Sequence, residues 1–595
     1  MNHASPRADT SRTAHGARHA AIPWRACWLS LGINALLFLL FFARCTPIFS
    51  SSDDPSMMKI AGGAATGSPD AHLIFMNILL GDLFKWAFTR APHVNWYALF
   101  QYAVLFLSYT TLCFCLLRLR CTWKAVMVYL LLFVGLGLYF LENPQFTDTA
   151  FLIGMSGLCL AVTAGTSSTR SAIGGMTFAA LCIILAGMIR FSSLYLLLLV
   201  SAPLLGYALY QTRSMRLALT IGLALLGFAI VKCYDSYQYA HTPGWSDYFA
   251  YQTDKSLLYD YPGLRGAAYT GPGGVYWDAN RHDPRVQRAL TQVGWSRNDA
   301  MMFLGLLSPQ DSTFSLAHLH LLTHRIPRVR HDNLSWYFHA AFSVVEVFIV
   351  LAILGIALPL LTRRYRCLLM ANTLLVFGVF MYLILFAKFP MYLEMPMLYY
   401  LCVLSVLCVF AQSVLFAGMP VSRWLAAPSS DWRRTCVLCG AFASALLIMA
   451  GQWNFWKADR LNIQSRRAYN DLQTYLLSHE DHLYVATVTA SCDQWMSPFA
   501  DLAPLRKLQI IRSGWSAGSP LANAELPAQT QNPYLPLYQQ ANCYLMSDQV
   551  SAEIIKQYLS EHLGVRVNYT CAYTFARNIG DDTFTAGFYQ FQRVH

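Results

Sequence analysis

Residues 28–63 read WLSLGINALLFLLFFARCTPIFSSSDDPSMMKIAGG, and they decide the fold. The uncharged apolar run 28–43 approaches the length of a bilayer crossing. Two adjacent carboxylates, Asp53 and Asp54, follow a short polar linker, and a pair of glycines closes the stretch. This order predicts a membrane helix whose outer loop carries two acids at the lipid boundary.

The composition of the whole chain is that of a membrane protein. Of its 595 residues, 56% are hydrophobic and 12% are charged, whereas about 25% charged residues is usual in soluble domains. Apolar runs near the ~20-residue bilayer length recur along the chain and predict about eleven transmembrane helices. We expect an α-helical polytopic membrane protein with a small C-terminal α/β domain.

The net charge of +12 reflects membrane topology. Of the 43 Lys and Arg residues, sixteen lie in six segments that the crossings place on one side, together with two of the 31 acids. This positive-inside pattern predicts a cytoplasmic amino terminus, an outer carboxyl terminus and no nucleic-acid partner. The six segments are 1–26, 118–124, 166–171, 211–216, 362–366 and 418–434.

The pattern divides the chain into a disordered cytoplasmic tail, a transmembrane domain and an extracytoplasmic domain, at 1–26, 27–452 and 453–595. Two long outer loops, 44–96 and 233–336, interrupt the transmembrane domain. Residues 72–88 of the first loop are apolar, but Asp82 and Lys85 interrupt them. We therefore expect this stretch to be a helix that lies in the membrane interface.

The last segment alternates helix and strand patterns. Its predicted elements are a helix at 456–477, strands at 482–488 and 508–511, a helix at 551–562 and a strand at 583–592. Ser551 is the predicted N-cap of the second helix. Three cysteines, Cys492, Cys543 and Cys571, fall here, and any pair of them can form a disulfide outside the cytoplasm.

Charged residues at the outer boundaries identify candidate chemistry. A carboxylate of Asp53 or Asp54 can take a proton from a hydroxyl group, as a general base does, or can simply cap the helix that follows. Lys59 and Arg190 can bind a phosphate at the outer boundary. Arg190 can equally anchor its helix by extending to the interface.

Two further pairs are candidates for acceptor binding. Glu142 and Asp148 flank an outer turn, where they can hold Mg²⁺ or Mn²⁺ through oxygen atoms or form a plain polar turn. Trp295 and Asp299 in the long loop can stack on a sugar and hydrogen-bond to it, although such aromatic residues also anchor proteins at the interface. Nothing in the sequence requires a metal.

This layout resembles the GT-C class of integral-membrane glycosyltransferases, and bacterial cell-surface polysaccharide transferases in particular. The motifs that carry the resemblance are 53–58 (DDPSMM) with glycines at 62, 63 and 67, and 294–299 (GWSRND). It implies inverting transfer of a sugar from an undecaprenyl-phosphate carrier to a glycan or lipid-linked acceptor, at the outer face of the bacterial cytoplasmic membrane. In that class an acid of the first outer loop is the base, and an acid of a later turn, here Glu142 or Asp148, orients the acceptor or a metal.

Other functions remain open. A transporter or flippase of lipid-linked glycans predicts charges deep in several spans and repeated halves, but we find Glu346 within a span and no repeat. A polymerase or ligase of surface polysaccharide shares the long outer loop and would rely on arginines there. A membrane sensor would need a cytoplasmic output domain.

Overall fold

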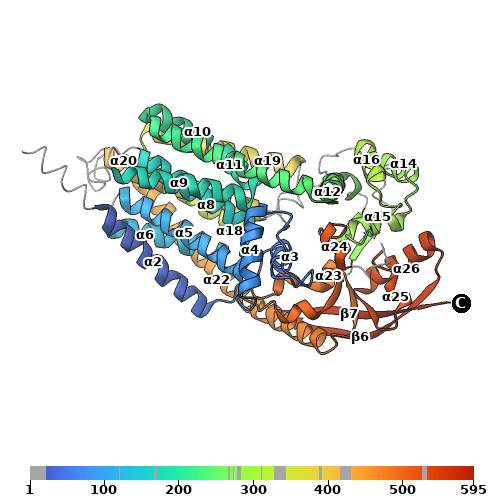
Figure 1. Ribbon diagram of the computed structural model, residues 1–595. Coiled ribbons are helices and arrows are strands. Elements are labelled where there is room, and N and C mark those ends of the chain that lie inside the picture. Colours follow the sequence, from blue (N-terminus) through green and yellow to red (C-terminus); the bar gives the residue numbers. More distant parts are fainter. Residues whose placement is uncertain are drawn as a thin grey trace, which may run out of the picture.

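The computed structural model describes residues 22–119, 121–165, 170–265, 268–271, 274–277, 283–309, 311–326, 344–386, 391–415, 431–525 and 532–594. The expected cytoplasmic tail, 1–26, lies outside these residues except for 22–26, which begin the first helix. A bundle of long helices forms one end of the molecule, and a mixed α/β body that contains the carboxyl end forms the other (Figure 1).

Helices occupy each of the eleven stretches predicted as crossings, within the described residues. They are α2 (Ile22–Arg44), α5 (Trp96–Leu119), the run of α6 (Trp123–Leu132), a π-helical turn (Phe133–Gly137) and α7 (Leu138–Glu142), then α8 (Phe146–Gly165), α9 (Arg170–Ile189), α10 (Phe191–Thr212), α11 (Met215–His241), α18 (Val344–Leu360), α19 (Arg363–Phe386), α20 (Met391–Leu415) and α22 (Asp431–Leu477). In the described parts of the chain, eight are long and apolar enough to cross a membrane, and α9 and α18 contain shorter apolar stretches. The protein is therefore a helical polytopic membrane protein, while the total of eleven crossings stays a prediction.

Helix α8 lies at the centre of the bundle. Its apolar stretch is 89% buried in the protein, compared with 22% for α11 at the periphery. Small residues permit this packing, because a Cβ atom on Gly157 would lie 2.9 Å from the Ala179 carbonyl oxygen of α9. Helix α8 therefore fixes the positions of its neighbours, including the segments that flank its start at residue 146.

The first long loop contains two short helices, α3 (Asp53–Gly62) and α4 (Ile78–Arg90). Helix α4 covers most of the stretch predicted to lie in the interface, and its 13 residues are too few to cross a bilayer. Its first turn is held twice. The Asn77 side chain accepts from the Leu79 amide at 3.0 Å, and the Asp235 carboxylate of α11 accepts from the Ile78 amide at 2.9 Å.

The second long loop contributes α12 (Trp245–Tyr259), α13 (Pro262–Arg265), the strand pair β1 (Ala268–Gly271) and β2 (Gly274–Trp277), α14 (Pro284–Gln292), α15 (Arg297–Leu304) and α16 (Leu316–Arg325). The last segment adds β3 (Leu483–Ala486), α23 (Val488–Ser491), β4 (Gln509–Arg512), α24 (Pro520–Glu525), α25 (Pro536–Gln539), β5 (Cys543–Ser547), α26 (Gln549–Leu563), β6 (Val567–Ile579) and β7 (Asp582–Arg593). Its five strands form a sheet of order β4-β3-β5-β7-β6, in which β3 runs parallel to β4 and β5 and the remaining pairs are antiparallel.

Helix α22 runs without a break through residue 452, where we expect the last crossing to end and the outer domain to begin. Two details of the last segment need correction. The N-cap of α26 is Asp548, whose carboxylate accepts from the Ser551 amide at 2.8 Å, and Ser551 is the third residue of the helix. Strands β5 and β6 were not predicted. Cys492, Cys543 and Cys571 are free thiols in this structure.

The two soluble segments share a hydrophobic core. Buried side chains between residues 251 and 326 pack in one cluster with side chains between residues 483 and 591. Buried residues of the tail such as Met496 and Leu502 join the core of the helix bundle. The second long loop and the tail therefore form a single body that rests on one end of the bundle, where α3 and α4 also lie (Figure 1).

Candidate functional site

A cavity of about 260 Å³ lies where α3, the start of α20, the second long loop and the tail meet. Its charged lining residues are Asp53 and Lys59 from α3 and Asp493 and Arg512 from the tail. Aromatic side chains from four different parts of the chain complete the wall, namely Phe75, Tyr259, Tyr392 and Trp515. The cavity thus combines two acidic residues, two positively charged residues and several aromatic rings at the end of a membrane-embedded bundle.

Helix α3 separates the two adjacent acids. Asp53 and Asp54 begin this helix, and Gly63 ends it with a positive φ of 77°. Successive residues of an α-helix point about 100° apart. Asp53 accordingly lines the cavity, whereas Asp54 is fully buried and absent from the cavity wall.

The buried Asp54 carboxylate joins α3 to two membrane helices. One oxygen accepts from the Tyr97 hydroxyl at 2.8 Å, from the Gln101 side-chain amide at 2.5 Å and from the Phe146 backbone amide at 3.1 Å. Burial raises the pKa of Asp54 to about 8, against these hydrogen bonds, which lower it. A carboxyl that is largely protonated at neutral pH and enclosed by protein holds α3 in place.

Lys59 reaches the cavity together with an acid from the tail. Its Nζ atom lies 2.5 Å from the Asp493 carboxylate, and 434 residues separate the two in the sequence. Both side chains are more than 90% buried, so the pair is shielded from water. Arg512 lines the same wall and donates to the Ala64 carbonyl at 3.4 Å.

Arg190 lies behind the cavity wall. It precedes α10, and its guanidinium lies 5.1 Å from the ring centre of Phe75 and 5.2 Å from that of Phe146. Phe75 lines the cavity and Arg190 does not. Burial lowers the pKa of Arg190, and the nearby negative charge of Asp53 opposes this effect. Arg190, which the sequence predicts to bind phosphate, therefore packs behind the aromatic wall of the cavity and lies near the charge of Asp53.

Glu142 and Asp148 do not line the cavity. Glu142 is buried and accepts from the Asn462 side chain at 3.1 Å, which ties α7 to α22. Asp148 is 1% exposed, and its carboxylate oxygens have no hydrogen-bond partner among the described residues. The structure thus places these two predicted acceptor or metal residues inside the protein.

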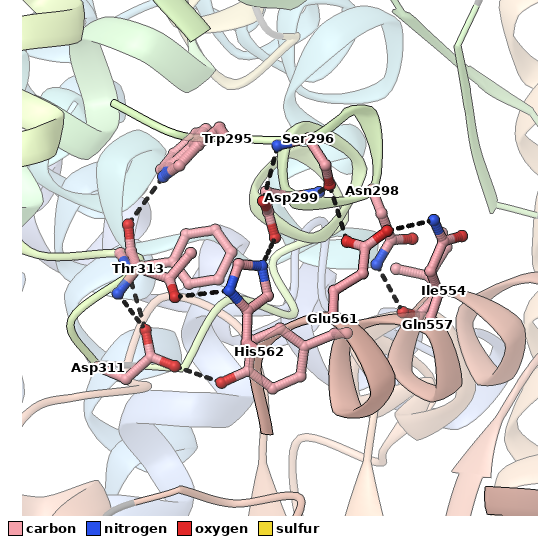
Figure 2. Close-up of polar contacts among 12 residues, drawn as sticks. Trp295, Ser296, Asn298, Asp299, Asp311, Thr313, Ile554, Gln557, Glu561 and His562 are labelled. Carbon is pink, nitrogen blue, oxygen red and sulfur yellow. Dashed lines mark hydrogen bonds and ion pairs between the residues drawn. The ribbon is translucent and has the colours of Figure 1, made fainter. Parts of the chain in front are cut away.

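Trp295 and Asp299 belong to a joint between the second long loop and α26, shown in Figure 2. The indole N–H of Trp295 donates to the Thr313 carbonyl at 2.7 Å. One Asp299 oxygen caps α15 by accepting from the Ser296 amide at 2.8 Å, and the other lies 2.8 Å from Nε2 of His562. The structure thus places the motif 294–299 away from the cavity.

The same joint contains the group of possible metal ligands found among the described residues, Asp299, Glu561 and His562. Each of them already has protein partners. Glu561 accepts from the Ser296 hydroxyl at 2.9 Å and from the Gln557 amide at 2.6 Å, and His562 also contacts Thr313 (Figure 2). The group is therefore explained as a polar contact between α15 and α26.

Sequence reasoning missed Asp493, Arg512 and the aromatic residues Tyr259, Tyr392 and Trp515. A signal for part of this wall was present. Ligands of sheets with parallel strands bind beyond the carboxyl ends of those strands. The parallel strands β3 and β4 end at Ala486 and Arg512, and both residues line the cavity.

Comparisons of the chain with protein-family models, with curated proteins and with solved structures gave no match.

Proposed function

We propose that this protein is a membrane glycosyltransferase that moves a sugar from a polyprenyl-phosphate carrier to a hydroxyl group of a cell-envelope glycan or lipid-linked acceptor. The observation that supports the proposal best is that Asp53 and Lys59, from one turn-and-a-half of α3, line the same cavity at the end of the helix bundle. Its volume of about 260 Å³ is slightly below the ~300–1,000 Å³ usual for ligand pockets. Such a volume suits one sugar and its phosphate, with the prenyl chain left in the lipid.

Asp53 acts as the general base in this mechanism. Its carboxylate takes the proton of the acceptor hydroxyl as the acceptor oxygen forms a bond to the anomeric carbon. The bond between that carbon and the phosphate oxygen breaks, and the polyprenyl phosphate leaves with the electron pair. A single displacement of this kind inverts the anomeric configuration.

Lys59 and Arg512 stabilise the negative charge on the departing phosphate. Both line the cavity, and the burial of the Lys59 ammonium strengthens its effect on a developing anion. Asp493 orients the Lys59 ammonium at 2.5 Å. Arg190, at 5.1 Å from the Phe75 ring, positions the wall beside Asp53.

The cavity does not fit Mg²⁺ or Mn²⁺. These ions need several oxygen ligands, commonly carboxylates. Of the two acids in the cavity, Asp493 already pairs with Lys59, and the charges of Lys59 and Arg512 oppose a further cation. The mechanism therefore assigns the neutralising role to the side chains of the protein.

The arrangement of charge supports the orientation with the cavity outside. The end of the bundle far from the cavity carries Arg118, Lys124, Arg213, Arg216 and Arg363 at its helix boundaries. Clusters of Lys and Arg mark cytoplasmic loops. We therefore place the cavity at the outer face of a bacterial cytoplasmic membrane.

The test is sugar transfer from polyprenyl-phosphate donors by purified Asp53→Asn. We expect transfer to fall by roughly 10²- to 10⁴-fold, the contribution of a general base. Asp581→Asn, an exposed acid outside the cavity, serves as the matched control and should keep full activity. Retention of transfer by Asp53→Asn would remove the proposed base. Movement of a lipid-linked glycan across liposomes without glycoside formation would favour a transporter.

A further inference from the structure

Trp515 is a cavity residue in a segment whose backbone is fixed by several side-chain hydrogen bonds. It lies in the loop that follows β4, lines the cavity with Asp53 and is partly buried. Loops at such positions normally need few fixing contacts. The carbonyl groups of Gly514 and Trp515 are both bound by one helix, α12, which belongs to the second long loop and lies beside α24 in the tail (Figure 1).

Side chains on one face of α12 form hydrogen bonds to the backbone of this loop. Tyr248, Gln252, Lys255 and Tyr259 follow one another at spacings of four, three and four residues and so share a helix face. The Tyr248 hydroxyl and the Gln252 amide both donate to the Trp515 carbonyl, at 2.9 and 2.8 Å. Three side chains of this face therefore bind the loop backbone, because Lys255 donates to the Gly514 carbonyl at 3.2 Å.

Lys255 also contacts the Trp515 ring. Its Nζ atom lies 5.2 Å from the ring centre, and the Tyr259 ring stands nearly perpendicular to the indole at a centroid distance of 5.5 Å. Lys255 is 2% exposed, and burial lowers its pKa to about 8. Burying an ammonium group against one carbonyl oxygen and one aromatic ring, with no carboxylate among these contacts, is costly. The cost indicates that the orientation of this indole matters.

The backbone of the loop is fixed from the other side as well. Gly514 has a φ of 113°, and a Cβ atom there would lie 3.1 Å from the Val488 side chain. Its amide donates to the Leu306 carbonyl at 3.3 Å. The residue before Trp515 thus admits glycine and little else.

From this geometry we infer that Trp515 is a stacking platform for the sugar ring of the donor, and that α12 is its positioning element. The inference rests on the proposed function. An indole face in a cavity that also holds charged groups offers an apolar surface to the C–H groups of a sugar, while the sugar hydroxyls remain free for charged neighbours such as Asp53. Fixing the ring in advance removes the entropy that a mobile tryptophan would lose on binding.

The test compares binding of two probes by the full-length protein in lipid nanodiscs. The probes are farnesyl phosphate and farnesyl phosphate linked to glucose, mannose or arabinose. We expect the wild-type protein to bind its best sugar-linked probe about tenfold more tightly than farnesyl phosphate, a difference of about 1.4 kcal/mol. Trp515→Ala should lose this preference and leave the affinity for farnesyl phosphate unchanged, and Trp515→Phe should retain most of it.

Controls separate the platform from the fold and from the reaction. Trp456→Ala removes an exposed tryptophan that does not line the cavity and should bind like the wild type. Lys255→Met, which weakens the positioning of the indole, should raise the KM for the donor less than Trp515→Ala does. Its kcat should stay at the wild-type value. Wild-type preference in Trp515→Ala would overturn the platform and leave the transferase intact. Failure of the wild-type protein to bind any prenyl phosphate would overturn both.

Discussion

Asp53 and Asp54 show how one step along a helix changes the chemistry of a carboxylate. Asp53 lines the cavity with Lys59, and Asp54 accepts three hydrogen bonds inside the protein. A carboxylate that can reach a substrate can act as a base. A carboxyl group enclosed by protein is more stable in its neutral form and can hold its helix in place through hydrogen bonds. The sequence pair DD marks the position without telling which acid does which.

Asp54→Asn should keep sugar transfer. Its stability relative to the wild-type protein should increase as the pH rises. Burial raises the pKa of Asp54 to about 8 from an ordinary value of 3.8, so the folded protein holds this proton more tightly than the unfolded chain. The stability that Asp54 contributes is therefore greatest below about pH 4 and is lost as the pH rises to about 8. The amide of Asn remains neutral, so its advantage in apparent Tm should grow from pH 5 to pH 8.

Thermal unfolding of both proteins in the same detergent at pH 5, 6.5 and 8 measures this effect. Asp53→Asn is the matched comparison, because it alters the neighbouring acid on the cavity side. A constant difference between Asp54→Asn and the wild type across these pH values would contradict the buried neutral carboxyl. Loss of transfer in Asp54→Asn with unchanged stability would assign the base to Asp54.

At the scale of elements, periodicity and polarity gave the helices of the bundle and α4. Apolar runs identified the membrane helices because a bilayer admits few alternatives. Asp82 and Lys85 distinguished α4 from the crossings, and its 13 residues are too few to span a bilayer. Strand β6 was missed because its side chains are mostly exposed, which leaves no regular alternation to detect. The N-cap of α26 was placed three residues late because Asp548 and Ser551 both suit that role.

The end of α3 offers a prediction at this scale. Gly63 has a φ of 77°, and a Cβ atom there would lie 2.6 Å from the Ser68 backbone carbon. Gly67 has a φ of 74° and no atom within 4 Å of the same position. Gly63→Ala should therefore lower the apparent Tm by several degrees more than Gly67→Ala, and it should reduce transfer because α3 carries Asp53 and Lys59. Equal losses in the two variants would show that the close approach at Gly63 is unimportant.

At the scale of the molecule, the cavity could be only half predicted. The sequence placed Asp53 and Lys59 at the outer boundary because they follow the first apolar run. It could not supply Asp493, which pairs with Lys59 across 434 residues. Such pairing depends on how the tail packs against the bundle, and no local pattern records it. Arg512 lies one residue beyond the predicted strand 508–511 and is the last residue of the observed strand β4, so its position was nearly predictable.

The shared core of the second long loop and the tail predicts that they unfold together. Leu559 on α26 is fully buried in this core, and its neighbour Ser560 is exposed. Leu559→Asp would bury a charge without a partner, which costs several kcal/mol. Trypsin should then cut at Arg285 and Arg288 in α14 more than about tenfold faster, as followed by mass spectrometry. Ser560→Asp should be cut like the wild type, and unchanged cleavage of Leu559→Asp would mean that the two segments are stable separately.

The ion pair between Lys59 and Asp493 also sets an order of assembly during synthesis. Lys59 leaves the ribosome 434 residues before its partner, an interval of about 20–90 s at the usual ~5–20 residues per second. Throughout that time the nascent chain is already inserted in the bilayer, but the tail residues that complete the cavity around Asp53 have not been made. On the proposed function, which needs both Lys59 and Asp493, transfer begins only after Asp493 has been synthesised, so a partly made chain is inactive.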